Sequence, residues 1–400
     1  MKNRGTHYEK LNKRRGLALA ILSVIIAFTL FGCRVDPEKF HPAETVYETA
    51  TASPTGDSNV TPTDEPYSAP TVEPTASPTT VPVSETPISF QDINFENAVR
   101  EAIGRMAGSI YPSDLQNIKS FTARVSGIVN IREITYFTSL EELDLMGNRI
   151  SDLTPLTSLK NLKKINIAKN FSVMTGDREK GLDISPLGSL PLLETLDASN
   201  DLITDISALG SLKMLKWLDI STNRLVNIDG IEGLVSLEYL NISNSFHSDK
   251  DNNPAGITEI SPLSALVNLK TLYMQNGRVN SLEPLTSLTQ LEYIDASYNS
   301  VRMLPDMKPM TGLKTLVLKS NFITGLAGLS GQQSVEVLDV RDNYITMINE
   351  ILMMRSLETV YLDGNPILSY IPLDLFNSLK NNPYNPPLPV PVQNQEQQKE

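Results

Sequence analysis

Cysteine and histidine are scarce in this sequence of 400 residues, which contains one cysteine, Cys33, and three histidines. A single cysteine excludes a disulfide within the chain, so a folded domain must be stabilised by an apolar core. His7 and His41 lie near the N-terminus, which leaves His247 alone in the body of the chain. These residues form neither a Ser/His/Asp triad nor a His/Cys metal site. We therefore expect no enzyme, no catalytic residue, no metal and no cofactor.

Positive charge is also in short supply beyond the N-terminus. The chain has 34 Lys and Arg against 46 Asp and Glu, a net charge of −12. Because six basic residues and one acidic residue give the first 32 residues a charge of +5, residues 33–400 carry −17. An acidic body disfavours nucleic acid and anionic lipid as partners.

The N-terminus has the pattern of an export signal. Basic residues precede an apolar run over residues 16–31, which at about 16 residues is shorter than the roughly 20 that span a bilayer as a helix. The run ends in the sequence LFGC at residues 30–33, which resembles the bacterial lipobox. That resemblance implies a lipoprotein signal peptide over residues 1–32 and a lipidated Cys33 that holds the protein at the extracellular face of the cell membrane. An uncleaved signal anchor with an incidental cysteine is the alternative.

Residues 33–88 form a segment rich in Thr, Pro and Ser, with no apolar periodicity. Such a composition cannot bury enough surface to fold, so we expect a disordered spacer. In an extended polyproline conformation about 50 residues reach on the order of 150 Å, which suits a domain held away from a membrane. A linker without that role is the alternative. Residues 381–400 are rich in Pro and Gln and are expected to form a disordered tail.

An internal repeat is the strongest signal in the sequence. Its template is Leu140-x-x-Leu143-x-Leu145-x-x-Asn148. Eleven copies place these residues in the asparagine slot: Ser126, Asn148, Asn170, Asp201, Asn223, Ser245, Gly277, Asn299, Asn321, Asn343 and Asn365. Consecutive slots are 22 residues apart, except for 31 between Asn170 and Asp201 and 32 between Ser245 and Gly277. Repeats of this length predict a solenoid in which each unit covers the apolar face of the next.

The template has a physical explanation. The stretch x-Leu-x-Leu-x alternates with period two, which is typical of a short strand, and stacked copies predict a parallel sheet on the concave face. A buried asparagine amide can bond the backbone groups left unpaired at the turn that follows. Serine or aspartate can take over part of that role, whereas Gly277 cannot.

Segments such as ISDLTPLTSLKNL and ITEISPLSALVNL resemble the internalin-type leucine-rich repeats of Gram-positive bacteria. The resemblance covers about residues 89–380. It implies an α/β solenoid, right-handed, with a parallel concave sheet over residues 120–380 and a helical N-terminal cap over residues 89–119. It says little about the ligand, because one fold hosts many functions.

Both ends of the solenoid are expected to be capped by helices. A helix over residues 94–106 would have one apolar face formed by Phe95, Val99, Ala102, Ile103 and Met106. The sequence SDLQ at residues 113–116 has the pattern of a capping box that opens a second short helix. Residues 372–380 are expected to form a terminal helix over the last repeat.

The outward positions of the concave strands provide the candidate ligand-binding residues. The template places four aromatic residues and two acids within neighbouring units: Trp217, Tyr239, Tyr273, Tyr293, Asp219 and Asp295. Clustered exposed aromatic residues are enriched at binding hot spots. The alternative is that these strands contain tyrosine because strands favour it.

Two insertions interrupt the repeat, at about residues 171–180 and 246–256. Both follow the asparagine slot and are expected to project from one edge of the solenoid. The second contains His247 together with Asp249, Asp251, Asn252 and Asn253. The side-chain oxygen atoms of these Asp and Asn residues could bind calcium. Because the spacing departs from that of an EF-hand, a plain surface loop is the favoured interpretation.

These features predict a monomeric, lipid-anchored surface protein that binds a protein partner through its concave face, as an adhesin or receptor does. A carbohydrate-binding or cell-wall-binding module is the alternative, since aromatic platforms with acidic neighbours also suit sugars. A structural scaffold of the cell envelope is the third possibility.

Overall fold

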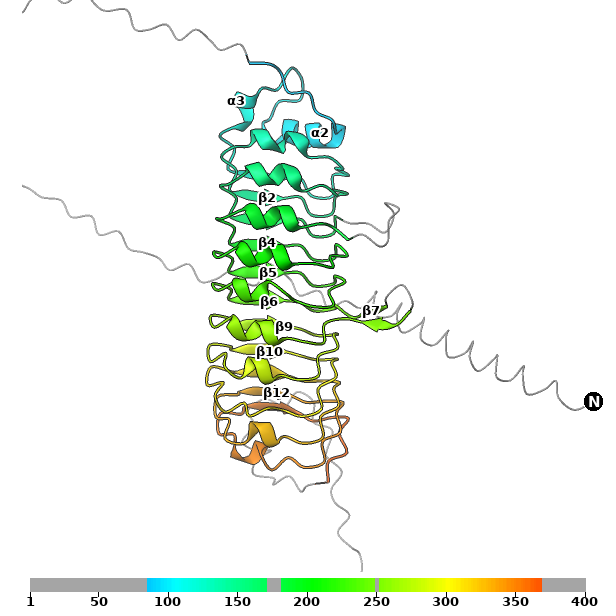
Figure 1. Cartoon of the computed structure of the whole chain (residues 1–400), viewed down its shortest axis with the longest axis vertical. Helices are drawn as coiled ribbons and strands as arrows, with labels where there is room; N and C mark the ends of the chain where they lie inside the picture. The colour runs from blue at the N-terminus through cyan, green and yellow to red at the C-terminus, as the bar shows by residue number, and fades with distance from the viewer. Residues whose placement is uncertain (1–84, 171–180, 249–251, 369–400) are drawn as a thin grey trace, which may run out of the picture. The chain divides into compact units, whose positions relative to one another are not determined.

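The computed structural model describes residues 85–170, 181–248 and 252–368, which form a leucine-rich-repeat solenoid. Its central feature is a parallel sheet of eleven strands, stacked one above the next in chain order (Figure 1). The strands are β1 (Ser120–Thr122), β2 (Glu142–Asp144), β3 (Lys164–Asn166), β4 (Thr195–Asp197), β5 (Trp217–Asp219), β6 (Tyr239–Asn241), β9 (Thr271–Tyr273), β10 (Tyr293–Asp295), β11 (Thr315–Val317), β12 (Val337–Asp339) and β13 (Thr359–Tyr361). The eleven predicted repeats are confirmed.

The strand register also follows the prediction. Within each strand the middle residue, such as Leu218, points into the core and its two neighbours point outward. Equivalent template positions pair across every junction, so that Trp217 lies beside Tyr239 and Leu218 beside Leu240. The register is unbroken where the spacing lengthens to 31 or 32 residues, because the insertions leave the sheet before the next strand begins.

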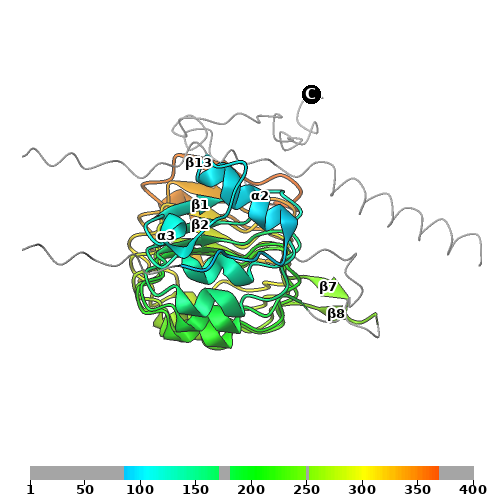
Figure 2. The same ribbon diagram turned by 90° about the horizontal axis from the view of Figure 1, so that it is seen from above.

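Single-turn 3-10 helices form the side of the solenoid opposite the sheet (Figure 2). Seven of the nine begin directly after a buried Leu or Ile, and several have proline in the first turn, where its missing N–H costs nothing. A buried apolar side chain from each helix packs into the core. The helices are η2 (Arg132–Tyr136), η3 (Thr154–Ser158), η5 (Ser185–Ser189), η6 (Ser207–Ser211), η7 (Ile231–Gly233), η8 (Ser261–Ala265), η9 (Glu283–Leu285), η10 (Ala327–Leu329) and η11 (Ile351–Met353).

The asparagine slots form the predicted ladder of buried amides. In a typical rung, Asn321 Oδ1 accepts from the Val301 N–H at 3.0 Å, and Asn321 Nδ2 donates to the carbonyls of Ala296 at 2.9 Å and Leu318 at 3.0 Å. One amide therefore joins its own strand to the preceding repeat. Asp201 takes over part of this role by accepting from the Asn170 N–H at 2.6 Å. At Gly277 a Cβ would lie 2.9 Å from Asn299 Oδ1, so a side chain in this slot would require the Asn299 amide to shift.

Left-handed backbone precedes every slot, a feature that the repeat pattern did not reveal. The φ angle of the residue before the slot lies between 51° and 75° in all eleven repeats. Two of these residues, Gly147 and Gly364, are glycines, whose lack of a Cβ suits the conformation. The other nine are Val125, Lys169, Asn200, Thr222, Asn244, Asn276, Tyr298, Ser320 and Asp342. Since such residues are strained there by about 1–2 kcal/mol each, the stacked turns must compensate for the strain.

The N-terminal cap is helical, with boundaries that differ from the prediction. Helix α2 covers Ile93–Ala102 rather than residues 94–106, and only Phe95 and Val99 of its expected apolar face are buried. Met106 lies beyond the helix and is 78% exposed. The helix ends early because Gly104 adopts a φ of +65°, which a right-handed helix excludes.

Helix α3 covers Pro112–Leu115 and begins one residue before the predicted capping box. The Asp114 carboxylate accepts from the Tyr111 N–H at 2.8 Å, so Tyr111 rather than Ser113 is the N-cap. Asp92 joins the cap to the first repeat, since its carboxylate accepts from N–H groups at the start of α2 and from those of Val129 and Asn130. Burial opposes ionisation of Asp92, but these donors outweigh it and lower its pKa.

The second insertion forms an antiparallel hairpin of β7 (His247–Ser248) and β8 (Pro254–Ala255), which projects from one side of the solenoid (Figure 1). Arg278 Nη1 donates to the Pro254 carbonyl at 2.7 Å and ties the hairpin to the next repeat. The first insertion, the acids Asp249 and Asp251, the terminal helix expected over residues 372–380, the signal peptide, residues 33–84 of the spacer and the tail lie outside the described residues. Residues 85–88, predicted to end the disordered spacer, instead contact the cap, since the Ile88 N–H donates to the Ile110 carbonyl at 2.8 Å.

Candidate functional site

Four aromatic side chains form a continuous row across the concave face. The rings of Trp217 and Tyr239, on β5 and β6, stack with centroids 4.9 Å apart and planes 8° apart. Tyr239 and Tyr273 are 5.7 Å apart, and Tyr273 and Tyr293 are 4.9 Å apart. On β5, β6 and β10 the aromatic residue is the first of the strand, whereas on β9 it is the last, Tyr273. Its ring still contacts both neighbours, so the row continues across β9. The structure thus brings together all four aromatic residues that were predicted to form the site.

The rings of this aromatic row are half-buried rather than freely exposed, because each covers the face of its neighbour. Burial, followed by the charge of Asp219, raises the pKa of Tyr239. Burial and the charge of Asp295 do the same for Tyr293. A tyrosine is protonated at neutral pH in any case, and these shifts move both phenols further from ionisation, so each can donate a hydrogen bond.

The last residue of each strand also points outward, and these residues form a second column on the concave face, the central column, which is rich in aspartate and asparagine. Seven members share one bond, in which a side-chain oxygen accepts from the N–H two residues later: Asp144, Asn166, Asp197, Asp219, Asn241, Asp295 and Asp339. This bond begins the turn after the strand. The predicted site acids Asp219 and Asp295 therefore have a structural role in addition to any role in binding.

The outer carboxylate oxygens of this central column have different partners. Asp144 Oδ2 accepts from Arg124 Nε at 2.7 Å, and Arg341 pairs with Asp339. Asp295 Oδ2 accepts from Gln275 Nε2 at 2.7 Å. In the middle of the sheet Asp219 Oδ2 accepts from an amide, Asn241 Nδ2, at 2.9 Å. Charge compensation by arginine thus occurs at the two ends of the column, and the middle keeps its negative charge.

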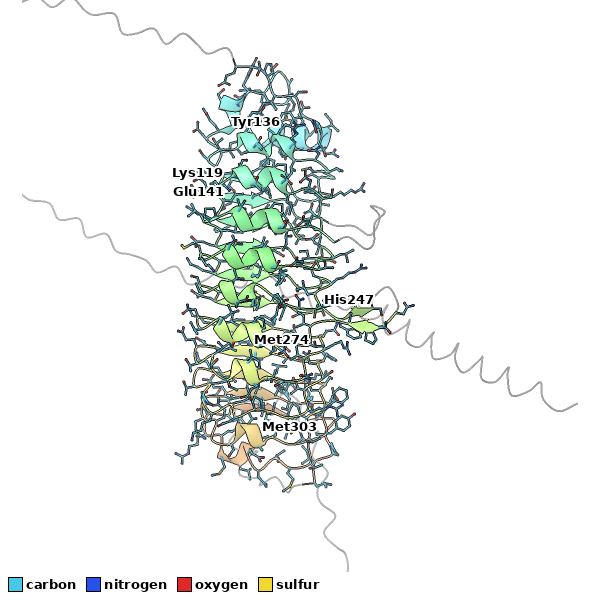
Figure 3. All side chains as sticks on the ribbon, viewed as in Figure 1. Lys119, Tyr136, Glu141, His247, Met274 and Met303 are labelled. Atoms are coloured by element: carbon cyan, nitrogen blue, oxygen red, sulfur yellow. The ribbon has the colours of Figure 1, made fainter. Side chains whose placement is uncertain are left out.

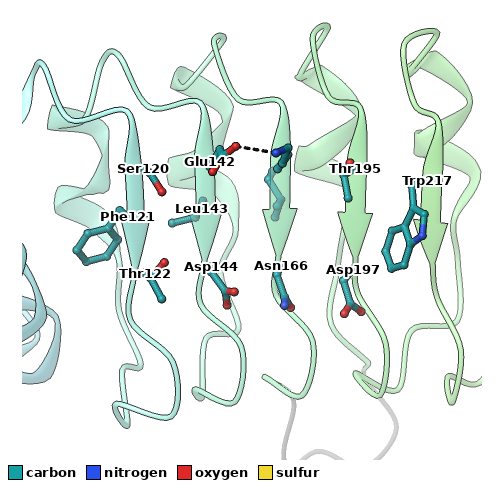
Figure 4. Close-up of a pocket in the computed structure, with 12 residues that line it drawn as sticks. Ser120, Phe121, Thr122, Glu142, Leu143, Asp144, Asn166, Thr195, Asp197 and Trp217 are labelled. Atoms are coloured by element: carbon teal, nitrogen blue, oxygen red, sulfur yellow. Dashed lines mark ion pairs between the residues drawn. The ribbon is translucent and has the colours of Figure 1, made fainter. Parts of the chain in front are cut away.

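A hollow of about 320 Å³, lined by both polar and apolar side chains, lies on the concave face between β1 and β5 (Figure 4). The side chains of Asp144, Asn166 and Asp197 line it, and the Trp217 indole closes one end. Burial, and then the neighbouring Asp219 charge, raise the pKa of Asp197. Sequence reasoning singled out Trp217 but missed Asn166 and Asp197, although both occupy outward positions of the same template.

Alternating charges follow one edge of the sheet, at the residue before each strand. From the first repeat the order is Lys119, Glu141, Lys163, Glu194, Lys216, Glu238, Lys270, Glu292, Lys314 and Glu336, and only Glu358 before the last strand departs from the alternation. Lys119 and Lys163 lie 3.0 and 2.6 Å from Glu141, and the Lys163 and Lys119 ammonium groups lower its pKa to about 2 (Figure 3 labels Lys119 and Glu141). Exposed pairs of this kind contribute little stability. They neutralise this edge, so the central column determines the charge of the concave face.

A second aromatic pair lies outside the concave strands. Phe322 and Tyr344 stack with ring centroids 6.1 Å apart and are 43% and 56% exposed. The Arg302 guanidinium lies 5.7 Å from the Phe322 centroid. This pair belongs to the turns after the asparagine slots of neighbouring repeats, and it offers a matched control for the aromatic row.

Within residues 85–170, 181–248 and 252–368, no group of three or more His, Cys, Asp and Glu side chains is arranged to hold a metal ion. The same residues include no helix that is long and apolar enough to span a bilayer.

Comparison with known proteins supports the repeat fold. A family model described as leucine-rich repeats in two copies matches residues 138–173. Among solved structures, internalin C2 of Listeria monocytogenes is 28% identical with a TM-score of 0.48, covering 56% of this chain and 92% of that one. The functional domain of InlJ from the same organism, which includes a cysteine ladder, is 21% identical with a TM-score of 0.56, covering 72% and 63%. A plant peptide hormone receptor, RGFR1, solved in complex with RGF2, is 19% identical with a TM-score of 0.54, covering 68% and 43%. No curated protein matches the sequence.

Proposed function

We propose that this chain binds a protein partner through the aromatic row on the concave face of its solenoid. The observation that carries the proposal is the continuous contact of four rings across β5, β6, β9 and β10. Clustered tryptophan and tyrosine side chains are typical of the anchor residues of protein interfaces. The plant receptor among the similar structures is itself solved with a peptide hormone, which shows that this fold can hold a polypeptide.

A carbohydrate ligand is the second candidate, favoured by the hollow that ends at the Trp217 indole. Sugars are recognised by planar polar side chains beside an aromatic ring, and the hollow contains both. Saturable binding on a glycan array, with no partner recovered by crosslinking on intact cells, would favour this function over the first.

Replacing Trp217 and Tyr239 together with alanine is expected to weaken partner binding about 30-fold, equivalent to about 2 kcal/mol. The partner is first identified by crosslinking on intact cells, and its Kd is then measured with the purified proteins. Because the two rings are half-buried and stacked, the double variant should also lose about 1 kcal/mol of stability.

The matched control is the double variant Phe322→Ala and Tyr344→Ala, which removes another stacked pair outside the concave strands. It should leave the Kd unchanged. Equal loss of binding in both double variants, or normal binding in the first, would place the contact surface elsewhere on the solenoid.

We also propose that the protein is exported and lipid-anchored through Cys33, which would display the solenoid at the outer face of the cell membrane. The short apolar run and the following LFGC sequence support this proposal. Wild-type protein should incorporate a radiolabelled fatty acid, whereas Cys33→Ala should not and should be released or remain an unprocessed precursor. Unlabelled wild-type protein would contradict the anchor.

A further inference from the structure

The repeats provide an internal comparison for each carboxylate of the central column. Asp144, Asp219, Asp295 and Asp339 each use one oxygen in the turn and the other in a bond to a cationic or amide side chain. In Asp197, Oδ1 accepts from both the backbone N–H and the hydroxyl of Ser199. Within the described residues no donor reaches Asp197 Oδ2. This oxygen therefore differs from its counterparts and faces the hollow.

Asp197 and Asp219 are direct neighbours across β4 and β5, so their carboxylates lie about one strand spacing, roughly 4.8 Å, apart. In the part of the chain that the structure describes, no Lys or Arg forms an ion pair with either of them. Two cations beside the hollow already form other ion pairs, since Arg124 pairs with Asp144 and Lys164 pairs with Glu142 at 2.8 Å. The centre of the face thus carries two adjacent negative charges without a counter-ion.

The wall of the hollow adds a second requirement for the ligand. One face of the Trp217 indole is covered by Tyr239, and among the described residues no second ring stacks on the opposite face, which lies toward Thr195 on β4. The indole, Thr195 and Asp197 all line this end of the hollow (Figure 4). Indole faces attract cations, and planar guanidinium groups stack on them most readily. A ligand at this point must therefore satisfy an acidic pair and an aromatic face together.

We propose that the hollow receives an arginine side chain of the protein partner. Its guanidinium stacks on the free face of Trp217 and donates to Asp197 Oδ2, which supplies the positive charge that the Asp197–Asp219 pair lacks. A lysine would neutralise the charge but would not provide the planar stack. This inference rests on the proposed function, because it assumes a protein ligand, and it predicts a basic residue at the centre of the partner's contact surface.

The single tryptophan of the chain provides a reporter for this site, since Trp217 is its only indole. We would titrate the protein with N-acetyl-arginine amide and follow the Trp217 fluorescence. A saturable change with a Kd on the order of 1 mM is expected, a weak affinity because one side chain supplies few contacts. N-acetyl-citrulline amide, which is planar but uncharged, should bind about tenfold more weakly or not at all.

Asp197→Asn should reduce arginine binding about tenfold or more while keeping the fold. Asparagine preserves the oxygen that begins the turn, and Asn241 shows that an amide is well accommodated beside Asp219. The melting temperature of Asp197→Asn should therefore equal or exceed that of the wild type. The matched control is Asp339→Asn, which removes the same charge from the same column but lies on β12, away from the hollow, and should bind arginine normally.

Equal responses to the arginine and citrulline compounds in the wild type, or an unchanged Kd in Asp197→Asn, would overturn the arginine site. A saturable response to chitotriose in place of arginine would also overturn it and would favour a sugar ligand. If arginine fails to bind while Trp217→Ala and Tyr239→Ala still weaken partner binding, only the arginine site is wrong. If arginine binds but the double variant leaves partner binding intact, the proposed function is wrong instead.

Discussion

Asn321→Leu is expected to lower the free energy of unfolding by about 3 kcal/mol, measured by urea denaturation. Leucine has the same number of side-chain heavy atoms as asparagine but offers no hydrogen bond. The side chain is 4% exposed, so the Val301 N–H and the carbonyls of Ala296 and Leu318 would lose their partner without gaining water. An unpaired buried backbone group costs about 1–3 kcal/mol, and relaxation of the turn recovers part of the total.

Asn299→Leu should behave in the same way, because its amide bonds the Val279 N–H and the carbonyls of Met274 and Ala296. The matched control is Asn59→Leu in the segment expected to be a spacer, which should leave the urea midpoint unchanged. If Asn321→Leu and Asn59→Leu had the same midpoint, the buried amides would contribute nothing to stability and the role assigned to the ladder would be wrong.

The register of the sheet could be predicted from sequence because two constraints agree. A period of two assigns each strand residue to the core or to the concave face, and the asparagine slot aligns each strand with the next. That is why Trp217 and Tyr239 were placed side by side, and why Leu218 and Leu240 were assigned to the core. Repeat architecture makes such assignments reliable, since an error of one residue would expose the leucines of every unit.

Contacts between neighbouring outward side chains could not be predicted in the same way. The repeat template predicts which residues line up on the concave face, but it does not predict their side-chain rotamers. Only the structure therefore shows that Trp217 and Tyr239 stack closely and are half-buried. Which donors reach the two carboxylate oxygens of Asp197 depends on what the neighbouring side chains already bind. The boundaries of the cap were missed for a local reason, because Gly104 and Tyr111 end and begin the helices at points that apolar periodicity does not mark.

Leu218→Ala is expected to destabilise the solenoid by about 2–5 kcal/mol, the cost of lost burial and of the cavity that remains. Leu218 is fully buried between Leu196 and Leu240, its register partners on β4 and β6. Both neighbours are held by their own strands, so the site cannot collapse to fill the space. The measurement is the urea midpoint of the purified variant.

Trp217→Ala is the contrasting variant, one residue away on the same strand. It removes a larger side chain, but one that points outward and is half-buried mainly by Tyr239, so the expected loss is only about 1 kcal/mol. A loss in Trp217→Ala as large as that in Leu218→Ala would mean that the aromatic row exists to stabilise the sheet. A small loss leaves four large rings on the concave face with no structural need for them, and binding is then the remaining explanation for why adjacent repeats carry them.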